Sequence, residues 1–200
     1  EAIGSSAEEG RDRAASPEPR DGHEMRHRAV ILALGLGVVS AGGIAALGWM
    51  GGFRLNATPS YPLGLWRIER PVGPIKVGAL VCICMPPGPG LTLGRERGYL
   101  RAGLCPGGAG PLIKTVAAMP GAHVEVGRSV TVDGRALGHS RVRLADAEGR
   151  ALVAYAGGVV RPGHLYLHSD YTGSYDSRYF GPLPDEGLLG LARPVATFDP

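Results

Sequence analysis

The chain has 200 residues and a formal net charge of +3 at neutral pH, which is enough length for one domain with a real core plus an appendage. Hydrophobic residues make up 44%, aromatic residues only 6%, and there are 33 Gly and 17 Pro, a mixture that favours a β-rich fold with many turns over a helical bundle. Lys and Arg are scattered, with no basic patch interleaved with aromatics, so nucleic acid is not an expected partner.

The N-terminal part divides into a polar tail and an apolar run. Residues 1–28 are polar and charged and predict a disordered tail. Residues 29–52 contain no charged side chain, and at about 1.5 Å per residue in a helix they are long enough to cross a bilayer core of about 30 Å. We therefore predict one transmembrane helix at 29–52, acting as a signal-anchor.

Flanking charge predicts the orientation of this helix. Arg26 and Arg28 stand directly before the apolar run, whereas only Arg54 follows closely, which keeps the tail in the cytoplasm and exports the remainder. A cleaved signal peptide ending near residues 51–52 is the rival interpretation. An uncleaved anchor is favoured because the apolar run exceeds a typical signal core.

Beyond the apolar run, short apolar segments alternate with Gly and Pro. Five segments read as strands: 78–87, 111–119, 123–138, 163–170 and 187–198. Asp133-Gly134 inside one of them signals a hairpin. Residues 88–110 are Gly-rich and are expected to form an insertion with one helical turn. The prediction for 53–200 is one mainly β, antiparallel domain.

Cysteine and histidine residues give little sign of a metal or cofactor. Cys82, Cys84 and Cys105 are too few and wrongly spaced for a zinc ribbon, and the six His residues show no metal-ligand spacing. Cys82 and Cys84 would share one face of a strand and bridge poorly, so Cys105 paired with either of them is one expectation. Three small buried thiols are the alternative.

Three segments hold candidate catalytic residues, and the first surrounds Ser60. This serine lies between Pro59 and Pro62, shortly after the apolar run. Proline fixes the backbone and excludes a helix there, so the segment is a rigid turn that can present a hydroxyl. A serine beside proline is more often only a turn residue.

The second candidate is Lys114, inside an apolar strand. In a regular strand it shares a face with Leu112, Val116 and Ala118, which are all apolar. Desolvation of an amine disfavours its charged form and lowers its pKa, as a general base near neutral pH requires. The alternative is a lysine that reaches solvent from an edge strand.

The third segment is a polar loop at 169–184. Several polar residues lie close together in sequence between apolar strands: Asp170, Ser174, Asp176, Ser177 and Arg178. This pattern indicates a hydrogen-bonded loop with a functional role. A solvated loop with a local Asp–Arg pair is the other interpretation.

The order of these segments resembles the type I signal peptidase superfamily, and most closely its TraF-type branch, the maturation peptidases of conjugation systems. The nucleophile segment of that branch reads Asn-x-Thr-x-Ser-x-Pro-x-Gly, which stands here as Asn56, Thr58, Ser60, Pro62 and Gly64. The run RGYLRAGLCPGG at 97–108 and the run DSRYFGP at 176–182 also fit. The resemblance covers residues 53–198.

This resemblance implies a coiled antiparallel β domain of the signal peptidase type and a Ser/Lys dyad without metal or cofactor. Ser60 matches the nucleophile and Lys114 the general base. Thr58 and the Ser60 amide match the oxyanion hole, and Ser174 matches a hydroxyl that orients the amine. Asp176 and Arg178 match the ion pair that braces the site.

The sequence departs from the superfamily pattern at three places. Thr115 stands where an Arg usually follows the catalytic Lys, and Ala122 replaces the Asp after Pro-Gly. The last loop opens with residues 169–171, Ser-Asp-Tyr, instead of Gly-Asp-Asn. Arg178 is therefore the expected partner of Asp176, with Asp170 substituting in part for the missing opening.

The implied function is processing of an exported precursor at the inner membrane, with the catalytic domain in the periplasm. The expected substrate is the pilin of a conjugative transfer system, and either water or the pilin's own amine, which would close a ring, resolves the acyl-enzyme. A general signal peptidase and a catalytically silent scaffold of the transfer apparatus remain alternatives. A cytoplasmic self-cleaving repressor is disfavoured, because an apolar span stands where its DNA-binding module would be.

Overall fold

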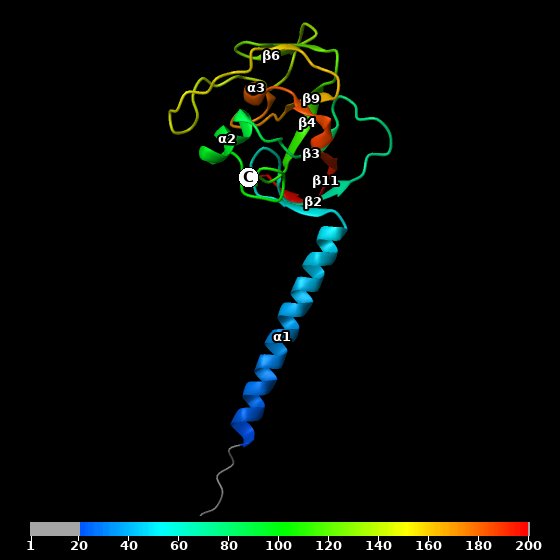
Figure 1. The fold of residues 1–200 in the computed structure, drawn as a ribbon, viewed down its shortest axis with the longest axis vertical. Helices are drawn as coiled ribbons and strands as arrows, with labels where there is room; N and C mark the ends of the chain where they lie inside the picture. The colour runs from blue at the N-terminus through cyan, green and yellow to red at the C-terminus, as the bar shows by residue number, and fades with distance from the viewer. Residues whose placement is uncertain (1–20, 200) are drawn as a thin grey trace, which may run out of the picture. The chain divides into compact units, whose positions relative to one another are not determined.

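The computed structural model describes residues 21–199 and divides into a helical part up to Ala46 and a compact part from Leu47 (Figure 1). Helix α1 runs from Asp21 to Met50. Its stretch Glu24–Met50 is long and apolar enough to cross a membrane, and the most apolar window has no buried residue.

The helix begins before the apolar run, which corrects the expected boundary at residue 29. Residues 21–28 form its first turns, where Glu24 and Arg28 make an i,i+4 ion pair at 3.5 Å. Such pairs and good helix-forming residues extend a helix past its apolar stretch. The rest of the predicted tail lies outside the described residues.

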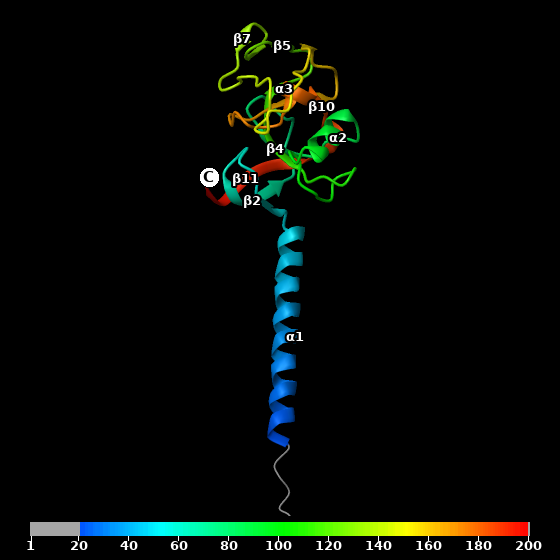
Figure 2. The same cartoon turned by 90° about the vertical axis from the view of Figure 1, so that its left-hand side faces the viewer.

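The compact part contains a seven-stranded antiparallel sheet, as predicted for this domain. Its strands, in spatial order, are β1 (Phe53–Asn56), β2 (Leu63–Glu69), β11 (Leu188–Phe198), β3 (Leu80–Ile83), β4 (Leu112–Ala118), β9 (His164–His168) and β10 (Leu183–Pro184). Figure 2 shows β11 lying along β2. The hairpin β1–β2 was not among the expected strands, because Pro and Gly interrupt its sequence.

A second antiparallel sheet has four short strands. Their spatial order is β7 (Arg135–Ala136), β6 (Val130–Val132), β5 (His123–Val126) and β8 (Gly158–Val159). The predicted hairpin at Asp133-Gly134 is confirmed: Val132 pairs with Arg135, and the two turn residues have φ of 49° and 74°. Positive φ at both positions is the type I′ geometry that suits the twist of hairpins.

The expected insertion at 88–110 is part of the main core. It carries helix α2 (Pro89–Glu96), which is longer than the single turn predicted. Leu91 and Leu100 are buried against the strand residues of the core, and the Tyr175 hydroxyl donates to the carbonyl of Gly90 at 2.9 Å. The segment therefore contacts the 169–176 loop through the hydrogen bond between Gly90 and Tyr175. Two short helical segments, α3 (Ser177–Phe180) and η1 (Asp185–Gly187), complete the domain.

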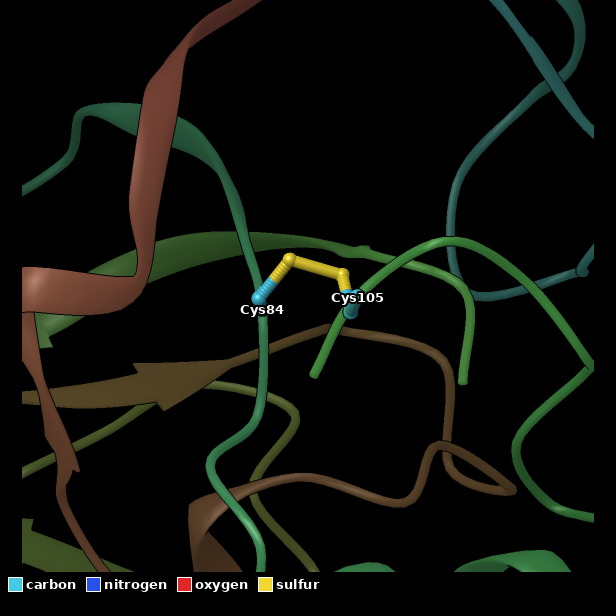
Figure 3. Close-up of a disulfide and its surroundings, with 2 residues drawn as sticks. All are labelled: Cys84 and Cys105. Atoms are coloured by element: carbon cyan, nitrogen blue, oxygen red, sulfur yellow. A yellow bond between two sulfur atoms is a disulfide. The ribbon is translucent and has the colours of Figure 1, made fainter. Parts of the chain in front are cut away.

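A disulfide fastens this segment to the large sheet. Cys84, directly after β3, bonds Cys105 with a Cα–Cα distance of 5.5 Å (Figure 3). Cys82 is free and buried. The pairing is one of the two that the sequence left open, and it excludes three unpaired thiols.

Removal of this disulfide is expected to lower the free energy of unfolding by about 2–4 kcal/mol, because the bond constrains a loop of the unfolded chain. The double variant Cys84→Ala/Cys105→Ala should melt at a lower temperature than the wild type when the full chain is heated in detergent micelles. Reductant should lower the melting temperature of the wild type and of Cys82→Ala but leave the double variant unchanged. A wild type insensitive to reductant would show that the bond contributes nothing.

Candidate active site

The Ser60 loop joins β1 to β2 and is organised by one side chain. The side-chain nitrogen Nδ2 of Asn56 donates to the carbonyls of Thr58, Tyr61 and Pro62 at 3.0, 2.9 and 3.1 Å. Its amide oxygen accepts from the backbone N–H and the hydroxyl of Thr58 at 3.2 and 2.8 Å. The loop is thus fixed by local hydrogen bonds, and it presents Ser60 as a half-buried residue.

Thr58 uses its hydroxyl proton inside this loop. That proton points to the Asn56 amide oxygen. A contribution of Thr58 to an oxyanion hole therefore requires this proton to turn toward the substrate, and the role stays a prediction.

Lys114 lies on β4 with its side chain buried at 2% exposure. Its Nζ donates to the Ser174 hydroxyl at 2.8 Å. Burial lowers the pKa of this amine to about 8; the charge of Asp176 opposes the shift and that of Arg178 adds to it. The alternative of a lysine reaching solvent from an edge strand does not hold, since β4 is an inner strand.

Ser174 links the two predicted catalytic residues. The Ser60 hydroxyl donates to the Ser174 Oγ at 3.4 Å, and the same oxygen accepts from Lys114. Within the described residues Ser60 and Lys114 make no direct hydrogen bond to each other. A hydroxyl, a bridging hydroxyl and an amine of lowered pKa form a path along which a proton can leave Ser60.

A fully buried ion pair holds the bridging serine. Arg178 donates from Nε and Nη2 to the two carboxylate oxygens of Asp176, each at 2.8 Å. Arg178 also donates to the backbone carbonyls of Arg141, Tyr171 and Ser174. Because both charged groups are 0% exposed, the bidentate geometry and these further bonds are what makes their burial tolerable.

Asp170 does not join this network, which corrects the expectation that it substitutes for the missing loop opening. Its side chain is 79% exposed, and its carboxylate lies 3.5 Å from Nε2 of His168. The physical reason is that Arg178 already donates to Asp176 and to three carbonyls, so Asp170 approaches the network only at its edge, through His168.

Three residues at the site were not singled out by sequence. The Tyr61 hydroxyl hydrogen-bonds the Thr115 hydroxyl and donates to the carbonyl of His168 at 3.3 Å. His168 is buried, and burial lowers its pKa; Nε2 faces the carbonyl of Gly138, while Nδ1 lies 3.7 Å from the Asp176 carboxylate. Ser169 contacts the loop of Ser60. The departures at Thr115 and Ser169 pointed to two of these contacts, those with Tyr61 and Ser60, whereas no departure marked His168.

Residues 27–196 match the family described as signal peptidase, peptidase S26. The conjugal transfer protein TraF of Agrobacterium fabrum is 53% identical over 176 residues, covering 88% of this chain and 100% of the relative. The probable conjugal transfer protein TraF of Sinorhizobium fredii is 50% identical, covering 88% and 93%.

A plasmid transfer protein TraF of Escherichia coli is 36% identical over 80% of this chain and 94% of its own. Among solved structures, a signal peptidase I from Enterococcus faecalis V583 aligns with a TM-score of 0.38 and 16% identity, over 60% of this chain and 98% of that one. The match of the family model and the identity to the first relatives extend over most of the chain, which therefore belongs to the signal peptidase family, peptidase S26.

Proposed function

We propose that this chain is a membrane-anchored serine endopeptidase in which Ser60 is the nucleophile and Lys114 the general base. The observation that carries the proposal is the buried Lys114 amine, joined to the Ser60 hydroxyl through the single oxygen of Ser174. Serine is a poor nucleophile until a base takes its proton, and only a neutral amine can do so.

The steps follow from this arrangement. The neutral amine of Lys114 takes a proton from Ser174 as Ser174 takes that of Ser60, and the Ser60 oxygen attacks the substrate carbonyl. The Ser60 N–H stabilises the oxyanion, and so does the Thr58 hydroxyl once its proton turns away from Asn56; each donor is worth about 3 kcal/mol. The Lys114 ammonium then returns the proton to the leaving amine, and water or a substrate amine attacks the acyl-enzyme.

The proposed substrate is an exported precursor, namely the pilin of a conjugative transfer system. The names of the relatives, which concern conjugal and plasmid transfer, support this choice. The proposed location is the inner membrane, with α1 as the single span and the β domain in the periplasm. Helix length and composition support the anchor, and the disulfide suits an oxidising compartment.

The test is processing of the pilin precursor by the full chain, followed by mass measurement of the product. We expect one specific cleavage; a product lighter than the linear fragment by one water would identify ring closure instead of hydrolysis. Equal cleavage of unrelated exported precursors would favour a general signal peptidase. A precursor left intact by the wild type would contradict peptidase activity and favour the scaffold.

Activity is expected to rise with pH. Because burial lowers the pKa of Lys114 to about 8, the active neutral amine is a minor species at pH 7 and the major one above pH 8. A plot of kcat/KM against pH should rise about tenfold per pH unit below that pKa and level off above it. If the rise of kcat/KM instead had its midpoint near pH 10.5, the ordinary pKa of lysine, the base would not be desolvated.

A further inference from the structure

We infer that Ser169 is a positioning residue for the nucleophile, acting on the backbone of Ser60 and not on its hydroxyl. The Ser169 Oγ donates to the carbonyl oxygen of Ser60 at 2.6 Å, across 109 positions of sequence. The inference rests on the proposed function, because it assigns a part to Ser169 in the same reaction.

The hydroxyl of Ser169 has only one direction in which to donate. Its oxygen accepts the backbone N–H of Tyr171 at 3.2 Å, and the residue is 0% exposed, so water does not compete. An oxygen that already accepts one hydrogen bond keeps its own proton for the remaining partner, which is the Ser60 carbonyl. Because this buried hydroxyl both donates and accepts a hydrogen bond, its orientation is fixed.

Ser169 is itself held by the buried ion pair. Its backbone N–H donates to the Asp176 carboxylate at 3.2 Å, on the oxygen that also accepts from Arg178 Nη2. Asp176 therefore orients Ser169, and Ser169 orients Ser60. The same loop supplies Ser174, which contacts the Ser60 hydroxyl, so residues 169–176 contact the nucleophile at both its main chain and its side chain.

A neighbouring contact fixes the side chain of the next residue, Tyr61. The Tyr61 hydroxyl donates to the carbonyl of His168, the residue directly before Ser169. With Ser60 tied through its carbonyl and Tyr61 through its ring, the peptide group between them cannot rotate freely. A shift of that peptide group would also displace the Ser60 Oγ, because the hydroxyl oxygen lies only three bonds from the carbonyl carbon.

The function of this contact is geometric. Reactive groups must approach within about 3–3.5 Å in the correct alignment, and a displacement of about 1 Å can cost about 100-fold in rate. Loss of the Ser169 hydroxyl leaves the Ser60 carbonyl without this donor and frees the peptide plane. Among the described residues the Ser169 hydroxyl bonds only Ser60 and Tyr171, and the pKa of Lys114 is lowered by burial and by the charge of Arg178, against the charge of Asp176. Loss of the hydroxyl alone should therefore leave the pKa of the base unchanged.

The test compares Ser169→Ala with Ser140→Ala in the full chain. Ser140 is a matched control: it is also buried, and its hydroxyl also bonds backbone groups, the N–H of Val130 and the carbonyl of Leu137. We expect Ser169→Ala to lower kcat for precursor cleavage by about 10- to 100-fold with KM unchanged and the pH limb unmoved. Ser140→Ala should cleave within about twofold of the wild type at a comparable melting temperature.

The possible results separate this inference from the proposed function. Cleavage by the wild type with an equal kcat for Ser169→Ala would overturn the positioning role alone. A shifted pH limb in Ser169→Ala would also overturn it, since the residue would then act through the charge of Asp176 on Lys114. If Ser169→Ala fails to fold, Ser169→Thr keeps the hydroxyl and must restore kcat. No cleavage by the wild type would overturn the proposed function instead.

Discussion

Ser60→Ala and Lys114→Met are each expected to abolish precursor processing, with a loss of about 10⁴-fold or more in kcat/KM. Ser60→Ala removes the attacking oxygen. Lys114→Met keeps the length of the buried side chain and removes the amine that accepts the proton through Ser174. Because the two residues act in one step, the double variant should lose no more activity than either single variant.

Thermal unfolding of the full chain in detergent separates loss of catalysis from loss of fold. The folded state lowers the pKa of Lys114 to about 8 from 10.5, so at pH 7 the buried ammonium costs about 3 kcal/mol. Since the unfolded chain binds more protons between these two values, wild-type stability should rise with pH through that window. Lys114→Met should therefore be at least as stable as the wild type at pH 7 and lose this pH dependence. Normal processing by Ser60→Ala would remove the claim of a serine peptidase.

Asp176→Ala should have the next largest effect, through stability as well as activity. It leaves the Arg178 guanidinium buried at 0% exposure without its carboxylate, which typically costs about 3–5 kcal/mol. The backbone N–H of Ser169 also loses its acceptor. We expect a large drop in melting temperature together with loss of processing.

A matched control for this variant lies on the domain surface. Glu69 pairs with Arg193 at 3.3 Å with side chains 39% and 64% exposed, so Glu69→Ala should change the free energy of unfolding by less than about 1 kcal/mol. Replacement of both buried partners by Asp176→Leu/Arg178→Met should recover much of the stability while activity stays absent. If Asp176→Ala and Glu69→Ala lowered the free energy of unfolding equally, the buried pair would contribute no more to stability than an exposed one.

Local pattern predicted much of this molecule. Short apolar runs between Gly and Pro located the strands that contain Lys114 and His168, because strand formation follows hydrophobic content and turn residues over a few positions. The apolar neighbours of Lys114 on one strand face allowed either a buried amine or a lysine reaching solvent from an edge strand, and the structure shows the buried amine. The paired positive φ at Asp133-Gly134 was likewise readable from two adjacent residues.

Contacts between distant segments were not readable in the same way. The bond between Ser169 and Ser60 and the bond between Thr115 and Tyr61 depend on how β9, β4 and the β1–β2 loop meet, and no local periodicity encodes that. The segment 88–110 looked like a surface insertion because it is Gly-rich. Leu91, Leu100 and Ala109 of this segment are nevertheless buried in the core, which also contains Tyr175, and the Cys84–Cys105 bond ties the segment to the sheet.

The position of β11 has a consequence for biogenesis. In the spatial order of the large sheet it is the only strand between the nucleophile hairpin, β1–β2, and the strands β3 and β4 that bring in the base. It is also translated after every other strand of that sheet. Until β11 is made, no strand pairing joins the hairpin that carries Ser60 to the strands that carry Lys114, and only side-chain contacts from the Ser60 loop link them. The proposed peptidase activity should therefore arise only after residues 188–198 have been synthesised and paired into the sheet.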